Sequence, residues 1–242
     1  MTIVTASGTK CVDIKGCKVK EKFIRKFMLL AKTIAEDNHV CYSRQIGAVI
    51  VDPNTNGVVS IGYNGPPEKT PHTDHPDYIR HFLWPQLTTQ EKYDLISIYW
   101  STLDITHKQR LQGLSVDCGL KNNEVCHSIL NEYLDFVCQH IKNCKVCPRK
   151  LLNCKSGERS ELCSCQHAER NALNKLPISP KGLIIFCWCG VPCIQCTGSI
   201  INAGIKEVHC LLDTDYHFVS RYLFATSNTN LFEYEKQKFL EG

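Results

Sequence analysis

The sequence predicts an α/β fold in which helices cover both faces of a central sheet. Beyond residue 163, helical and β-rich segments alternate along the chain, and such alternation is typical of a sheet with helices on both sides. Nearer the N-terminus, two β-rich segments at 46–52 and 58–65 are separated by turn-forming residues, which predicts a hairpin. Together these segments predict a central mixed sheet of about five strands.

Each element of the α/β part has its own signal. Apolar residues recur at helical spacing over 19–37 and predict the first helix. Pro192 is expected at the first position of a later helix, and Gly204 is expected to end that helix. The other expected elements are a helix at 166–176, strands at 182–188 and 206–212, a helix near 215–225 and a short strand near 231–235.

The strand signals stop in the middle of the chain. Over about 66–160 the composition shifts toward His, Pro and aromatic residues and then toward Cys. We therefore expect a single domain, 1–242, with its core at 19–65 and 163–236 and a Cys-rich helical insertion between them.

Two helices are expected within the insertion. Thr88 and Glu91 have the spacing of a capping box and predict the start of a helix that extends to about Leu111. Apolar residues on one side of the segment 123–141 predict the other helix.

The composition excludes several classes of protein. With 43% hydrophobic and 21% charged residues, the chain is expected to fold around a core. No secretory signal or membrane span is recognisable, so we expect a cytoplasmic protein with no membrane partner, whose 16 cysteines are metal ligands or free thiols rather than disulfides. The net charge of +4 is too small to favour nucleic acid as a partner.

Two short motifs lie at the expected starts of consecutive helices. The first is H-x-E, with His167 and Glu169, and the second is P-C-x-x-C, with Cys193 and Cys196. Residues three apart on a helix share a face, and a helix N-terminus stabilises thiolates. One imidazole and two thiolates are ligands of the kind of catalytic zinc site whose fourth position is left for water. A redox dithiol alone would explain neither His167 nor Glu169.

Glu169 is the residue that such a site offers for proton transfer. Zinc lowers the pKa of a bound water to about 7, so hydroxide is available at neutral pH. H-x-E with a later P-C-x-x-C is the signature of zinc deaminases, in which the glutamate is not a ligand. We expect Glu169 to take a proton from the water, to protonate the ring nitrogen beside the reacting carbon, and then to protonate the departing amine.

These motifs resemble those of the cytidine and deoxycytidylate deaminase superfamily, most closely those of zinc-dependent deoxycytidylate (dCMP) deaminases. The resemblance covers 20–65 and 163–236. It is carried by S43-R-Q-I-G-A-V-I-V51, G62-Y-N-G-P66, C165-Q-H-A-E-R-N-A172, P192-C-I-Q-C196 and I200-I-N-A-G-I-K-E-V208. It implies a three-layer αβα cytidine-deaminase-like fold and the hydrolytic deamination of dCMP to dUMP, which would supply dUMP for thymidylate synthesis.

The resemblance also implies contacts with the nucleotide. Asn64 would hydrogen-bond the sugar, the backbone of Ala168 would lie near the base, and Tyr216 would stack on the base. Asn64 is also compatible with an ordinary turn, and Tyr216 with a buried core position. Candidate donors to the 5′-phosphate are Arg44, Lys69 and Arg170. Several members of the family bind deoxynucleoside triphosphates and form hexamers, so dCTP or dTTP effectors and a homo-oligomer are expectations for this chain.

The chain departs from the family pattern just before P-C-x-x-C. The family usually has a threonine-containing strand end there, whereas this chain has Cys187 and Cys189. Both thiols are compatible with packing in the strand, and Cys189 is also compatible with a contact to the zinc site or a place in a second one.

The end of the insertion predicts a second, structural zinc in a zinc knuckle. Cys-x-x-Cys followed by further cysteines is a usual arrangement of a closed tetrahedral site, which would stabilise a segment with little core of its own. The resemblance agrees with this expectation, because related phage-type dCMP deaminases carry a structural zinc. The favoured ligands are Cys144, Cys147, Cys154 and Cys163, and alternatives for the later positions are Cys126, His127, Cys138, His140 and Cys165.

Alternative functions stay open at this point. The substrate could be another cytosine nucleotide, such as dCTP or a 5-modified dCMP, or a base in single-stranded DNA or RNA. In the polynucleotide case, the stacking residues would be Trp84, Tyr93, Tyr99 and Trp100. A regulatory zinc module that binds nucleotides without turnover is a third reading, against which the intact H-x-E and P-C-x-x-C motifs argue.

Overall fold

Five short strands form one mixed sheet. The structure, a computed structural model, describes residues 19–38, 41, 44–117, 124–144, 147–155, 158–212 and 217–240. The first two strands form the hairpin and pair antiparallel, the third pairs antiparallel with the first, and the last three are parallel to one another. In spatial order the strands are β2 (Gly57–Tyr63), β1 (Gly47–Asp52), β3 (Ile184–Cys187), β4 (Glu207–Leu211) and β5 (Asn230–Tyr234).

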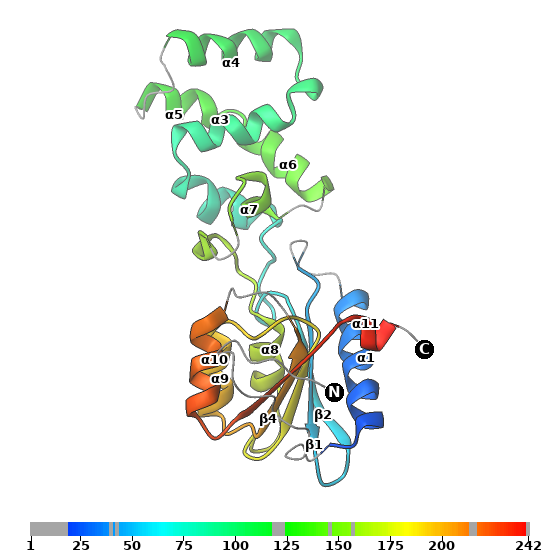
Figure 1. Ribbon diagram of the computed structural model, residues 1–242. Coiled ribbons are helices and arrows are strands. Elements are labelled where there is room, and N and C mark those ends of the chain that lie inside the picture. Colours follow the sequence, from blue (N-terminus) through cyan, green and yellow to red (C-terminus); the bar gives the residue numbers. More distant parts are fainter. Residues whose placement is uncertain are drawn as a thin grey trace. The chain divides into compact units, whose positions relative to one another are not determined.

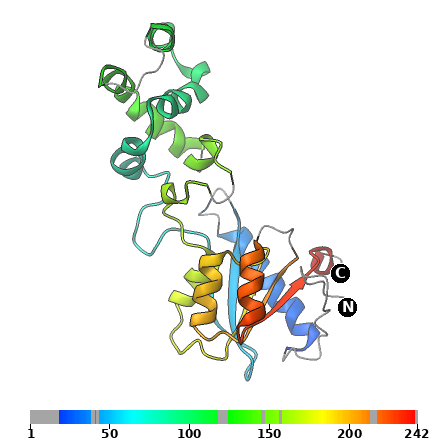
Figure 2. The same ribbon diagram turned by 60° about the vertical axis from the view of Figure 1, so that its left-hand side comes forward.

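Helices cover both faces of this sheet (Figures 1 and 2). On one face, α1 (Glu21–Asp37) and α11 (Gln237–Leu240) pack against a core that includes Phe186 and Phe232. On the other, α8 (Ala168–Asn174), α9 (Ile194–Asn202) and α10 (Phe218–Thr226) pack against a separate apolar cluster. Residues from all the central strands alternate between these two cores, as the pleat of a strand requires. The prediction of a three-layer αβα fold with a mixed five-stranded sheet is confirmed.

Two glycines bring helices into backbone contact with the hairpin. A Cβ on Gly47 would lie 2.2 Å from the carbonyl oxygen of Ala31 in α1, and a Cβ on Gly62 would lie 2.2 Å from the carbonyl oxygen of Ala168 in α8. Only a residue without a side chain allows approaches this close. The two strands β1 and β2 therefore each hold one helix, on opposite faces of the sheet.

Some element boundaries differ from those that the sequence predicts. The helix expected to start at Pro192 begins at Ile194 instead, with Cys193 as its N-cap residue, so Pro192 lies outside the helix. The short C-terminal helix α11 was not predicted, and its Phe239 is buried in the core beside α1.

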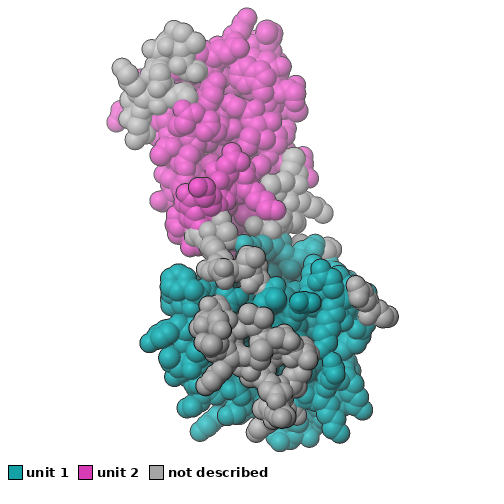
Figure 3. All heavy atoms as spheres, in the orientation of Figure 1, with its two compact units in different colours: residues 1–65, 166–242 teal, residues 66–165 magenta. Residues whose placement is uncertain are grey.

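The chain divides into two compact units (Figure 3). Unit 1 comprises 1–65 and 166–242, and unit 2 comprises 66–165. The described part of unit 2 is helical, and its elements are α2 (Pro76–Tyr78), a π-helical turn (Ile79–Leu83), a 3₁₀ turn (Trp84–Gln86), α3 (Thr89–Ile98), a 3₁₀ turn (Trp100–Thr102), α4 (Ile105–Asp117), α5 (Glu124–Asn131), α6 (Leu134–Cys144), α7 (Pro148–Leu151) and a 3₁₀ turn (Ser160–Leu162).

The predicted capping box in unit 2 is present. Each of the two predicted helices is divided in the structure, the first into α3 and α4 and the second into α5 and α6. The Thr88 hydroxyl accepts from the backbone N–H of Glu91, whose carboxylate accepts from the N–H of Thr88. The helix that starts there ends at Ile98, and α4 starts again where the Asp104 carboxylate accepts from the N–H of His107. Side-chain acceptors of this kind favour the start of a helix, which explains why α4 begins as a separate helix after α3.

Unit 2 also has a core of its own. Buried side chains such as Leu83, Leu95 and Ile141 pack together within it. The expectation that this segment has little core was therefore wrong, because the apolar faces of its short helices meet one another. None of the described helices has the length and apolarity that crossing a membrane requires.

Candidate active site

Two helix starts in unit 1 bring the H-x-E and P-C-x-x-C motifs together. His167 is the N-cap residue of α8 and Cys193 is the N-cap residue of α9. The Nδ1 atom of His167 lies 3.4 Å from Sγ of Cys193 and 3.5 Å from Sγ of Cys196. The three ligand atoms all lie within 4.8 Å of one another, so one ion could contact all of them.

The two thiols of this group share a proton. The pKa of Cys193 is lowered to about 3, because the Cys196 thiol donates a hydrogen bond to its sulfur and because His167 faces it, although burial opposes the shift. The pKa of Cys196 is raised, since its proton is held by Cys193 and its sulfur is buried. The pair therefore favours a thiolate at Cys193, and displacement of the proton on Cys196 would give the second thiolate that a zinc site needs.

Glu169 lies beside the group with one carboxylate oxygen unpaired. Its side chain is buried, and its Oε2 atom has no hydrogen-bond partner in the described part of the chain. Burial raises the pKa of this carboxyl, while His167 lowers it. A buried polar atom without a partner is costly, so this position is suited to a group that arrives from solution, such as water or a substrate nitrogen.

Asn64 and Ala168, both predicted to contact the nucleotide, contact each other. The side-chain oxygen of Asn64 accepts from the N–H of Ala168 at 2.8 Å, and its amide nitrogen donates to the carbonyl of Arg44 at 3.4 Å. Asn64 is 5% exposed. Asn64 thus hydrogen-bonds the first residue of α8, and its contact with the sugar stays a prediction.

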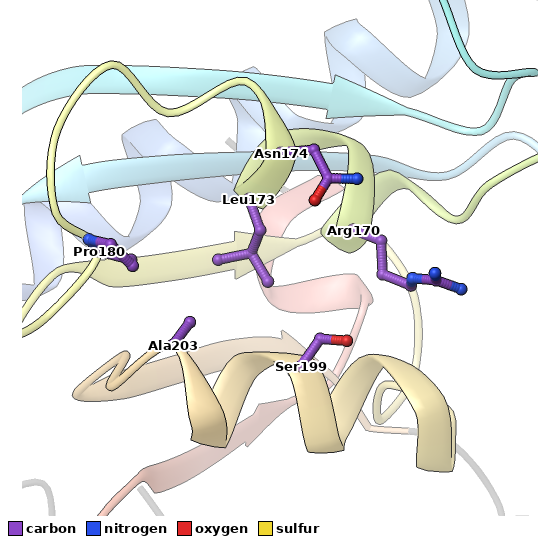
Figure 4. A pocket seen from close by; sticks show the side chains of 6 residues that line it. All are labelled: Arg170, Leu173, Asn174, Pro180, Ser199 and Ala203. Carbon is purple, nitrogen blue, oxygen red and sulfur yellow. The ribbon is translucent and has the colours of Figure 1, made fainter.

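The other residues predicted to contact the nucleotide are three cationic residues and Tyr216. Arg44 is exposed in the segment before β1. Arg170 lines a groove of about 280 Å³ between α8 and α9, together with Leu173 and Ser199 (Figure 4). Lys69 belongs to unit 2 and is exposed, with a backbone φ of 63°. Tyr216 lies outside the described residues.

Cys187 is buried in the apolar cluster between the sheet and α8, and Cys189 is half-buried beside the same cluster. Their thiols are hydrogen-bonded to each other. The pKa of Cys187 is raised by this bond and by burial. For Cys189 the bond to Cys187 lowers the pKa, but burial and the nearby Glu169 raise it above its ordinary value. Packing in the strand, one of the two interpretations of these thiols, fits Cys187, whereas Cys189 follows the end of β3 and packs against the same cluster.

Unit 2 contains a second cysteine cluster. The sulfur of Cys163 is hydrogen-bonded to the thiols of Cys147 and Cys165, which lower its pKa to about 2, and the pKa of Cys147 is raised correspondingly. Cys154 instead donates to the carbonyl of Leu152 at 3.9 Å. The side chain of Cys144 lies outside the described part of the chain.

The other candidate ligands of the insertion have different partners. Cys138 donates to the carbonyl of Pro76 at 3.8 Å, and Nδ1 of His140 lies 2.9 Å from the carbonyl oxygen of Phe136. His127 lies with its Nδ1 atom 3.1 Å from the amine of Lys92. Cys126 is fully buried in the core of unit 2. The sequence offered Cys165 only as an alternative ligand, because spacing alone does not distinguish it from Cys154.

Comparison with known proteins identifies a relative in sequence. Over 77 residues the chain is 35% identical to the deoxycytidylate deaminase of Schizosaccharomyces pombe, a stretch that covers 31% of this chain and 24% of the relative. The match thus spans about a quarter of the relative's length. No protein-family model matches the chain.

Two solved structures were also compared with the chain. The dCMP deaminase of cyanophage S-TIM5 in complex with dCMP and dUMP has a TM-score of 0.47 at 15% identity, covering 89% of this chain and 98% of that one. RibD of Acinetobacter baumannii, form 1, has a TM-score of 0.44 at 11% identity, covering 91% of this chain and 37% of that one. The resemblance to the cytidine and deoxycytidylate deaminase superfamily, predicted from the motifs, is confirmed by the relative in sequence.

Proposed function

We propose that this chain is a zinc-dependent deaminase of a cytosine nucleotide, and that dCMP is its substrate. The observation that carries the proposal is the group of His167, Cys193 and Cys196 beside the unpaired buried oxygen of Glu169. The similarity to the deoxycytidylate deaminase of S. pombe supports the choice of nucleotide. The reaction consumes one water and converts dCMP to dUMP and ammonia.

The three ligand residues fit a catalytic zinc ion. Two thiolates and a neutral imidazole balance the ion's charge and leave its fourth position open. When bound, zinc would lower the pKa of the attacking water, so that hydroxide is available at neutral pH. The N-terminal ends of α8 and α9 hold the three side chains in place, so little rearrangement is needed for binding.

Glu169 carries the protons of the reaction. Its unpaired Oε2 accepts a proton from the attacking water and delivers it to the ring nitrogen next to the carbon under attack. Glu169 then takes the remaining proton from the hydroxyl group added to the ring carbon and passes it to the amino group, so that the ring carbonyl forms and ammonia leaves. Burial favours the protonated form of Glu169, which suits a group that must hold a proton between these two steps.

The nucleotide would be held by residues around the same helix start. We assign the base to the backbone of Ala168 and to Tyr216, the sugar to Asn64, and the 5′-phosphate to Arg44. Of these, Asn64 and Ala168 lie directly beside His167 and Glu169, which supports their place in the substrate site.

Deamination of a base in a polynucleotide is less well supported. Of the four aromatic residues that would stack on such a strand, Trp84 and Tyr99 are buried, at 3% and 8% exposure. The indole N–H of Trp84 also donates to the side chain of Asn131 at 2.7 Å. These rings act as core residues of unit 2.

Incubation with a panel of cytosine nucleotides tests the proposed activity. The purified protein should release ammonia from dCMP and form dUMP, while dCTP, CMP and 5-methyl-dCMP measure the selectivity for phosphate, sugar and base. Single-stranded DNA and RNA belong in the same panel. Turnover of the polynucleotides alone, or nucleotide binding without turnover, would contradict the proposal.

We propose a second, structural zinc in unit 2, held by Cys147, Cys163 and Cys165, with Cys144 as the predicted fourth ligand. The hydrogen bonds of Cys163 with Cys147 and Cys165 support this set over one that includes Cys154, which bonds to the carbonyl of Leu152. Metal analysis should give two zinc ions per chain. Cys165→Ser should lose one of them, and the matched variant Cys154→Ser should keep both. Loss of zinc in Cys154→Ser but not in Cys165→Ser would reverse the assignment.

Three further expectations rest on the family resemblance alone. They are regulation by dCTP or dTTP, assembly into a homo-oligomer such as a hexamer, and a role in supplying dUMP for thymidylate synthesis. Each stays a prediction, and the first is tested by adding the triphosphates to the dCMP assay.

A further inference from the structure

Asn171 lies on α8 two residues after Glu169 and bonds to the loop that carries Asn64. Its amide nitrogen donates to the carbonyl of Tyr63 at 2.8 Å and to the carbonyl of Gly65 at 3.4 Å. These carbonyls belong to the residues on either side of Asn64 in the sequence. Asn171 therefore holds the backbone of the loop before and after Asn64.

The same loop is bonded to the start of α8 at further points. The side chain of Asn64 accepts from the N–H of Ala168, the first residue of the helix. This bond satisfies one of the N–H groups that a helix start leaves without an internal partner. The backbones of Gly65 and Gln166 also exchange two hydrogen bonds, of 2.7 and 3.2 Å. These hydrogen bonds form a closed ring of contacts, which consists of the loop around Asn64, Ala168 at the start of α8, and Asn171. We call this set of contacts the ring.

Backbone packing leaves this ring little freedom. A Cβ on Gly62 would lie 2.2 Å from the carbonyl oxygen of Ala168 and 2.4 Å from the nitrogen of Ala172. The hydroxyl of Ser60 donates to the carbonyl of Ala172 at 2.7 Å. Since the backbone of α8 lies directly on β2 at Gly62, loss of a hydrogen bond in the ring should shift the first turn of the helix, because no side chain lies between the two backbones there to adjust instead.

The amide of Asn171 suits these contacts, and a carboxylate would not. One NH₂ group has two N–H donors, one for each of the two carbonyl oxygens, whereas aspartate would place a negative charge against both oxygens. Asparagine is also a weak helix former, because its side chain competes for backbone hydrogen bonds. Asn171 therefore costs the helix some intrinsic stability, and its side chain bonds outside the helix.

We propose that Asn171 is a positioning residue for the deamination. It holds Asn64 and the first turn of α8, with His167 and Glu169, in one arrangement, and it acts through these residues rather than on the reacting atoms. The inference rests on the proposed function, because that function places the nucleotide against Asn64 and Ala168.

Kinetics of substituted proteins give the first test. Asn171→Ala and Asn171→Asp are compared with Asn174→Ala and Asn174→Asp, which make the same changes at an exposed position of the same helix. The Asn171 variants should raise KM for dCMP by about tenfold, as expected for loss of a paired hydrogen-bonding group, with rates expressed per bound catalytic zinc. The Asn174 variants should match the wild type. An unchanged KM, with activity lost only in proportion to zinc or folded protein, would show a merely structural role and overturn the proposal.

A double-mutant cycle tests whether Asn171 acts through Asn64. If it does, the effect on KM of Asn171→Ala should largely disappear in a protein that already carries Asn64→Ala, because residues in one network are not additive. Full additivity of the two effects would overturn the proposal.

Amide hydrogen exchange tests the same inference without a substrate. The N–H of Ala168 should exchange faster in Asn171→Ala than in the wild type or in Asn174→Ala, since its acceptor Asn64 is no longer held. Unchanged exchange at Ala168 would overturn the positioning role. If the wild type fails to deaminate dCMP, the proposed function fails, and the exchange measurement still decides whether Asn171 orders the start of α8.

Discussion

The most informative single residue is Glu169, because its environment is unfavourable unless it has a partner. The side chain is 2% exposed, and its Oε2 atom lacks a hydrogen bond among the described residues. Leaving such a group unpaired costs about 1–3 kcal/mol, and more if it is charged. Because the cost falls beside a group of side chains that could hold a metal ion, it supports the proposed role of Glu169 as a proton acceptor.

Replacing Glu169 by glutamine tests its proposed role. The amide has nearly the same shape but cannot carry a proton, so the rate of dCMP deamination should fall by at least about 10²-fold. Zinc content and thermal stability serve as controls, and both should stay near the wild-type values. Retention of full activity in Glu169→Gln would remove Glu169 from the mechanism.

At the scale of elements, the candidate site depends on how closely α8 approaches β2. The helix carries Glu169 and begins directly after His167, and Gly62 permits its backbone to touch the strand. On the opposite face, Gly47 permits the same approach by α1. The hairpin that the sequence predicts therefore also determines how closely α8, which carries Glu169, approaches the sheet.

The substitution Gly62→Ala tests this close approach. The new methyl group would lie 2.2 Å from the carbonyl oxygen of Ala168, so α8 must move, and both stability and deaminase activity should fall. Gly198→Ala is the matched control, because a Cβ there meets nothing within 4 Å and alanine favours the helix by about 0.5–1 kcal/mol. Urea unfolding and the dCMP assay measure both variants. Equal stability of the two would contradict the contact.

A second prediction at this scale concerns the capping box of α3. Thr88→Ala removes the acceptor of the Glu91 N–H and should destabilise unit 2 by about 1 kcal/mol. Thr88→Ser keeps the hydroxyl and should lose much less. Hydrogen exchange of the amides in the first turn of α3 reports the change locally, and equal protection in the two variants would show that the cap is not important for this helix.

For the whole molecule, the sheet and the metal-ligand group were predictable from sequence, because each depends on short-range patterns. Alternating β-rich and helical segments determined the three layers, and the spacing within H-x-E and P-C-x-x-C determined which side chains meet. The ring of Asn64, Ala168 and Asn171 was not predictable, because its contacts join residues more than 100 positions apart. The core of unit 2 was missed for a similar reason, since in the described part of that unit it is shared by several short helices and helical turns.

The core of unit 1 also contains a buried polar group that links stability to pH. His209 is fully buried between the rings of Phe186 and Phe232, with Nδ1 2.8 Å from the hydroxyl of Tyr234 and Nε2 3.3 Å from a carboxylate oxygen of Glu207. Burial lowers the pKa of His209, and the bond to Glu207 opposes the shift without reversing it. The folded protein therefore binds this proton less readily than the unfolded chain does.

Because the pKa of His209 is lower in the folded protein than in the unfolded chain, the free energy of unfolding should depend on pH. Above the ordinary histidine pKa of about 6.5 both states are neutral at this position and the stability is fully present. As the pH falls below that value, the unfolded chain takes up a proton that the folded protein does not, so the free energy of unfolding should fall by up to about 1.4 kcal/mol per pH unit. Urea unfolding of the wild type and of His209→Gln at pH 7.5 and pH 5.5 measures the effect. The variant should lose less stability between the two conditions, and an equal loss in both proteins would assign the pH dependence to other groups.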